Sequence, residues 1–68
     1  MKLIKSTWNA HQSKYERQYI ANDESEITAD FDPDSADGST ILCVSTGNVF
    51  IKNADSKWQK FGTTEVIS

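Results

Sequence analysis

The chain has 68 residues, a net charge of −3, one cysteine and one histidine. A chain of this length buries only about 60% of the surface of its unfolded form, so we expect one domain with a small core. One cysteine excludes an internal disulfide, and one cysteine with one histidine excludes the usual four-ligand zinc sites. The acidic balance argues against nucleic-acid binding. A core of this size gives little stability without a disulfide or a metal, so we expect a partner protein or oligomerisation to stabilise the fold.

Residues 1–14 show neither an alternating nor a helical pattern, and their apolar spots are Leu3-Ile4 and Trp8. We expect an extended N-terminal arm, because chain ends are poorly ordered unless contacts hold them. Trp8 then either returns to cap the sheet or inserts into a neighbouring protein as an anchor. In the second case Leu3, Ile4 and Trp8 are the partner-binding residues.

Residues 14–21 predict the first strand, with Tyr15, Arg17 and Tyr19 on one of its faces. The next strands are predicted at residues 39–45, 48–52 and 57–61, with turns at Thr46-Gly47 and at Asp55-Ser56. The expected core residues are Tyr19, Ile41, Cys43, Val49, Ile51 and Trp58. Leu42, Val44, Phe50 and Phe61 cannot all share that face, so a second apolar face has to meet the acidic loop, the arm or another molecule.

The connection between residues 22 and 37 is acidic, contains the only proline and has no basic residue. Residues 23–26 can form one helical turn, after which Ile27 and Phe31 fasten the connection to the sheet. Its carboxylates are either simply solvated or form a charged interface. The candidates for such an interface are Asp30, Asp32 and Asp34.

The acidic run does not match a calcium-binding loop. Counted from Asp30 as position 1, such a loop requires glycine at position 6 and glutamate at position 12, where this chain has Ser35 and Ile41. The single histidine, His11, has no cysteine or serine partner that the sequence places beside it. We therefore predict no metal, no cofactor, no catalytic residue and no enzymatic activity.

The predicted fold class is mainly β: a small antiparallel β-meander of three to four strands, with an extended N-terminal arm and an acidic loop that can hold one helical turn. The expected division is an arm at 1–14, a domain at 15–62 and a tail at 63–68. The tail either extends a sheet edge or stays mobile. No signal peptide and no membrane span are expected, since no apolar stretch is long enough.

Residues 36–44 (ADGSTILCV), 46–51 (TGNVFI) and 57–58 (KW) resemble small virion proteins of tailed bacteriophages. Residues 14–20 (KYERQYI) and the aromatic residue of the arm are similar to the start of those chains. The resemblance implies a non-enzymatic virion component that is made in the bacterial cytoplasm, as a capsid-decoration or head-fibre protein. Its partners would be major capsid or neck and tail subunits, with the chain as a homo-oligomer or bound to the lattice.

Three other functions are compatible with the sequence. The first is a neck or tail accessory protein of the same virion. The second is an adaptor or inhibitor that binds a basic host protein through the acidic connection. The third is a carbohydrate-binding module that uses Trp58 and the tyrosines.

Overall fold

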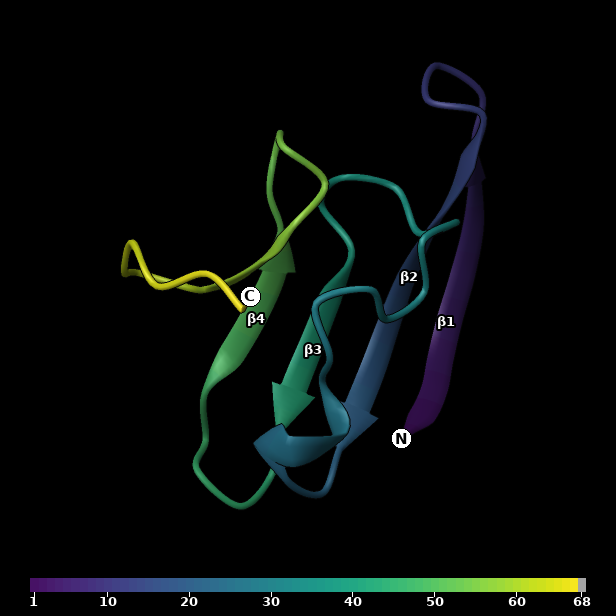
Figure 1. The fold of residues 1–68 in the computed structure, drawn as a ribbon. Helices are drawn as coiled ribbons and strands as arrows, with labels where there is room; N and C mark the ends of the chain where they lie inside the picture. The colour runs from purple at the N-terminus through teal and green to yellow at the C-terminus, as the bar shows by residue number, and fades with distance from the viewer. Residues whose placement is uncertain (68) are drawn as a thin grey trace.

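A computed structural model describes residues 1–67, and its architecture is mainly β, as the sequence predicts. Five strands form one sheet in chain order (Figure 1). They are β1 (Lys2–Asn9), β2 (Lys14–Ala21), β3 (Thr40–Cys43), β4 (Val49–Lys52) and β5 (Trp58–Lys60). Neighbouring strands are antiparallel except β2 and β3, which are parallel, so the sheet is mixed. The long acidic connection makes the parallel pair possible, because a parallel neighbour requires a crossover that a tight turn cannot provide.

The segment expected to be an extended arm outside the sheet is strand β1, which pairs with β2 from Lys2 to Asn9. The Asn9 side-chain oxygen caps the turn by accepting the N–H groups of His11 (3.0 Å) and Gln12 (3.2 Å). The register shifts between Leu3 and Lys5. This bulge breaks the alternation of side chains, which is why the sequence shows no strand pattern here. The β1–β2 hairpin therefore crosses the boundary expected at residue 14.

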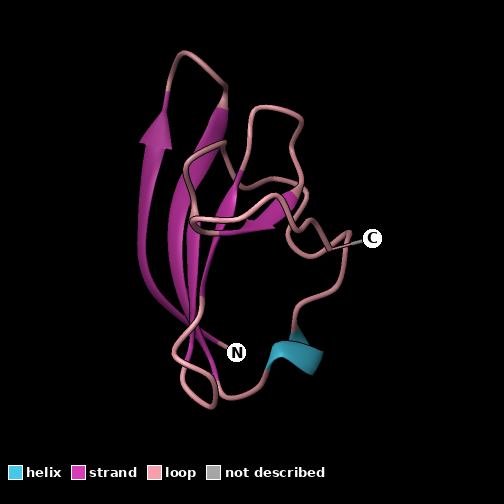
Figure 2. Cartoon of the chain, turned by 90° about the vertical axis from the view of Figure 1, so that its left-hand side faces the viewer, coloured by secondary structure: helices cyan, strands magenta, loops and turns pink. Residues whose placement is uncertain are grey.

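The acidic connection crosses one face of the sheet, which we call the covered face (Figures 1 and 2). It contains the expected helical turn, a 3₁₀ helix η1 at Glu24–Glu26. The Glu26 carboxylate accepts the backbone N–H groups of Asn22 (2.7 Å) and Asp23 (2.9 Å), which stabilises the start of the turn. Ile27 is buried and Phe31 packs against the core, as expected for residues that fasten the connection to the sheet.

The core lies between the covered face and this connection. Ile41, Cys43 and Trp58 are fully buried, and Tyr19 packs against them. Val49 and Ile51, which were also expected in the core, are only half-buried and point to the opposite face. Phe50, which was expected on the second face, takes their place in the core, because it is the residue that pairs with Ile41 in the β3–β4 register.

We call the opposite side of the sheet the open face, because no segment of residues 1–67 covers it (Figure 2). Its apolar side chains are Ile20, Leu42, Val44, Val49, Ile51 and Phe61. Leu42, Val44 and Phe61 retain 42%, 61% and 67% of their accessible surface. The chain beyond β5 extends the sheet at its β5 edge, since Val66 bridges to Gln59 and Ile67 packs against the core.

Candidate functional site

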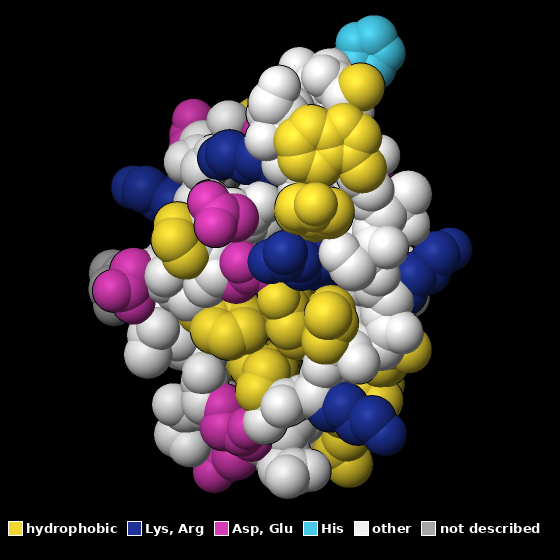
Figure 3. Space-filling model, turned by 90° about the vertical axis from the view of Figure 1, so that its right-hand side faces the viewer, with side chains coloured by type: hydrophobic (Ala, Val, Ile, Leu, Met, Phe, Trp, Pro, Cys, Tyr) yellow, Lys and Arg dark blue, Asp and Glu magenta, His cyan; other side chains and the backbone are white. Residues whose placement is uncertain are grey.

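The residues expected to bind a partner lie on the edge strand β1 and are exposed. Leu3, Ile4 and Trp8 retain 47%, 56% and 55% of their accessible surface. Seen from the β1 side, hydrophobic side chains form two patches with a basic side chain between them, and the upper patch lies close to the only histidine (Figure 3). The register of β1 against β2 holds these apolar side chains in fixed positions, which a flexible arm would not do.

Trp8 contacts Tyr15 across the hairpin. The two residues are direct partners in the β1–β2 register, and their rings meet edge to face with centroids 5.0 Å apart. The Arg17 guanidinium carbon lies 4.8 Å from the centre of the Tyr15 ring, which is a cation–π distance. We call Trp8, Tyr15 and Arg17 the aromatic strip.

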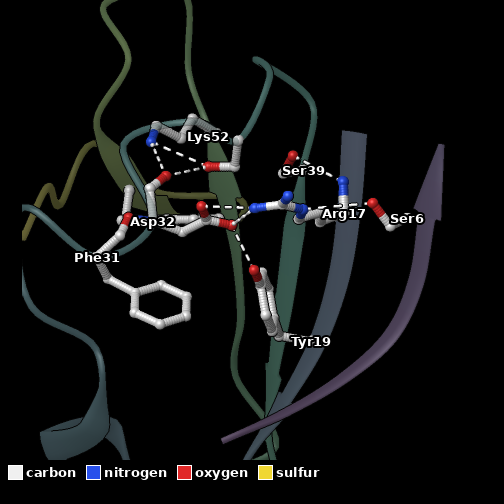
Figure 4. Close-up of polar contacts among 9 residues, drawn as sticks. Ser6, Arg17, Tyr19, Phe31, Asp32, Ser39 and Lys52 are labelled. Atoms are coloured by element: carbon white, nitrogen blue, oxygen red, sulfur yellow. Dashed lines mark hydrogen bonds and ion pairs between the residues drawn. The ribbon is translucent and has the colours of Figure 1, made fainter. Parts of the chain in front are cut away.

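Hydrogen bonds fix the guanidinium of Arg17 at the end of this strip (Figure 4). Its Nη1 donates to both carboxylate oxygens of Asp32, at 2.8 and 2.9 Å, and its Nε donates to Ser6 Oγ at 3.3 Å. The hydrogen bond to Asp32 raises the pKa of Arg17 above its ordinary value. The strip therefore ends in a cation whose orientation is set before any partner arrives.

Asp32 is the centre of the polar cluster. Besides the two bonds from Arg17, its carboxylate accepts the hydroxyl of Tyr19. Burial alone raises the pKa of Asp32, but the hydrogen bonds from Tyr19 and Arg17 outweigh burial and the pKa is lowered overall. Burial, and then the carboxylate, raise the pKa of Tyr19. Asp32 is thus occupied within the molecule and is not free for the charged interface that was expected, whereas Asp30 and Asp34 are exposed.

Lys52 lies under the acidic connection and retains only 4% of its accessible surface. Its Nζ donates to Ser35 Oγ (3.0 Å) and to the Asp32 carbonyl (3.1 Å), and it lies 5.1 Å from the centre of the Trp58 ring. Burial lowers the pKa of Lys52. Trp58 Nε1 donates to the Phe31 carbonyl at 2.9 Å. Two strands therefore hold the backbone of the connection through side-chain donors.

Residues 1–67 contain no cluster of histidine, cysteine and acidic side chains able to hold a metal ion, and they enclose no pocket. No helix in this part of the chain has the length and apolarity to cross a bilayer. Cys43 is buried, with its Sγ 3.5 Å from Ser45 Oγ. The feature best suited to binding a partner is the aromatic strip.

The sequence predicts part of this strip. Trp8 is expected either as a cap on the sheet or as an anchor, and the alternation in residues 14–21 places Tyr15 and Arg17 on one face. Their contact with Trp8 depends on the hairpin, which the bulge in β1 conceals. The sequence marked Asp32 only as a candidate for a charged interface and did not mark Lys52, because the bonds of both residues form only when the acidic connection packs over the sheet.

Comparison of the chain with protein-family models, with curated proteins and with solved structures finds no match.

Proposed function

We propose that this protein is a non-enzymatic docking module that binds other protein subunits through the aromatic strip and its apolar neighbours Leu3 and Ile4. The observation that carries the proposal is an exposed tryptophan, Trp8, packed on an exposed tyrosine, Tyr15, whose ring also contacts the half-buried guanidinium of Arg17. These three residue types are enriched among the few residues that carry most of the binding energy at protein interfaces.

The contacts within the strip support this use. The cross-strand register fixes Trp8 and Tyr15, and Asp32 and Ser6 fix Arg17. Side chains that are ordered before binding lose less conformational entropy when a partner covers them, so more of the contact energy appears as affinity.

The sequence resemblance narrows the proposal to a tailed-phage virion, in which the chain decorates the capsid. The size of the domain agrees with this assignment. A partner that binds only the folded form stabilises it by mass action, and a capsid offers many copies of the binding surface.

The test uses particles of the phage whose genome encodes this chain. Wild-type protein should copurify with the particles, and Trp8→Ala should bind protein-depleted particles roughly 30-fold more weakly, as expected for loss of a residue worth about 2 kcal/mol. His11→Ala is the matched control, since His11 is exposed at the tip of the same hairpin. Quantitative mass spectrometry of purified particles gives the occupancy.

Loss of binding by misfolding is checked with the second tryptophan. Trp58 is fully buried, so its blue-shifted fluorescence should persist in the Trp8→Ala variant. A folded variant that occupies particles as fully as wild type would contradict the proposal, and so would the absence of the wild-type protein from purified particles.

A further inference from the structure

The open face carries a continuous apolar row. Ile20, Leu42 and Val49 are direct cross-strand partners on β2, β3 and β4. Phe61 continues the row, because its backbone N–H donates to the Val49 carbonyl at 2.7 Å. Ile51 lies on the same face two residues further along β4. The row therefore crosses the sheet at right angles to the strands.

The edges of the sheet are protected against strand addition. β1 carries Lys2 and Lys5 and a register shift, which are common protections of an edge strand. At the other edge, the Glu65 carbonyl accepts the N–H of Lys60 at 2.9 Å. The open face has no comparable protection at its centre, where Leu42 is exposed between Ile20 and Val49.

We propose that the open face binds the open face of a second copy of this chain, so that two sheets pack into a two-layer β-sandwich. The two longest dimensions of the molecule are 33 and 24 Å, which bound the face at about 800 Å². A standard-sized protein interface takes about 800 Å² from each partner, so a dimer of this size would use nearly the whole face.

The charge distribution favours a second copy of the chain as the partner of the open face. The acidic connection lies on the covered face, so two copies can join their open faces while most of their negative charge stays on the two outer sides (Figure 2). By strand alternation, the charged residues on the open face at its β1–β2 side are Lys2, Lys5, Lys14 and Glu16. Both signs are present, which a two-fold contact between identical surfaces can use. The aromatic strip lies on the covered side and remains exposed in this dimer.

The test is sedimentation equilibrium of the full chain over a range of concentrations. Wild type should dimerise, and Leu42→Lys should raise the dissociation constant of the dimer by roughly tenfold or more. Each copy then contributes one lysine to the apolar interface, so two new positive charges are buried there. Ala29→Lys adds the same charge to an exposed position in the acidic connection and should dimerise like wild type. Circular dichroism of Leu42→Lys reports whether the monomer remains folded.

A second measurement does not depend on any variant. In a mixture of isotope-labelled and unlabelled protein, intermolecular NOEs should connect the methyl groups of Leu42 and Val49 with open-face residues of the other copy. A chain that stays monomeric at about 1 mM, or a dimer whose intermolecular NOEs lie at β1, would overturn the proposal. A monomer that still binds particles through Trp8 would overturn the dimer and leave the proposed function standing.

Discussion

At the scale of single residues, Asp32 holds the acidic connection in place from two sides. Its backbone is in the left-handed region, with φ 46°, which a short polar side chain tolerates better than most others. This conformation directs the carboxylate to Arg17 and Tyr19, while the carbonyl accepts Ser35 Oγ at 2.7 Å. One residue of the connection therefore bonds to β2 through its side chain and closes its own turn through its backbone.

Replacing Asp32 by asparagine should destabilise the protein and change its response to acid. A hydrogen bond to a charged group contributes about 1.5–3 kcal/mol, so we expect the free energy of unfolding at neutral pH to fall by roughly that amount. Since the folded-state pKa of Asp32 is lowered, its contribution is complete above the ordinary aspartate pKa of about 3.9 and is lost as the pH falls through the lower folded value.

Urea unfolding at several pH values below about 6 tests this expectation. The stability of wild type should decline more steeply with acid than that of Asp32→Asn. A residual slope should remain in the variant, because hydrogen bonds from Thr46 and Asn48 also lower the pKa of Glu24. Asp34→Asn is the control, since Asp34 is exposed, and it should behave like wild type. Parallel pH profiles for wild type and Asp32→Asn would contradict the role assigned to Asp32.

At the scale of elements, the alternation of side chains predicts β2 with its observed bounds. The predicted strands at residues 39–45, 48–52 and 57–61 each contain an observed strand. Tight turns and period-2 patterns are local, so a sequence can display them. β1 is the exception, because its bulge removes the pattern that identifies the other strands.

The facing of β4 could not be predicted from its own residues. Val49, Phe50 and Ile51 are all apolar, so either face suits the core by composition. The β3–β4 turn decides the outcome by placing Phe50 opposite Ile41. A shift of one residue would exchange the two faces. In the same way, the grouping of Arg17 with Asp32 depends on contacts between segments far apart in the chain.

The β3–β4 turn depends on Gly47, whose φ is 74° and whose N–H donates to the Cys43 carbonyl at 2.9 Å. No atom lies within 4 Å of the position of an added Cβ, so alanine would fit sterically but would strain the backbone. Gly47→Ala should lower the free energy of unfolding by about 1–2 kcal/mol, and Gly47→Asn by less, because asparagine adopts this conformation more readily. Urea unfolding measures both. Equal stability of the alanine variant and wild type would show that the turn does not require a left-handed residue.

At the scale of the whole molecule, the single sheet separates two exposed surfaces. The aromatic strip lies beside the acidic connection, and the open face lies on the other side of the sheet. A dimer joined through its open faces would carry two strips. When its geometry matches neighbouring subunits of a lattice, such a dimer binds far more tightly than either strip alone, because the second contact becomes intramolecular.

Dimerisation also predicts how the thermal midpoint depends on concentration. A second copy binds the folded chain and not the unfolded one, so the midpoint should rise with protein concentration. For a domain of this size we expect a rise of about 5 °C or more over a hundredfold range, since 1 kcal/mol corresponds to about 4–8 °C. Leu42→Lys should flatten this dependence and Ala29→Lys should preserve it. Differential scanning calorimetry at matched concentrations measures the midpoints. A wild-type midpoint that stays constant over the hundredfold range would mean that the chain folds and remains stable alone, with its open face in water.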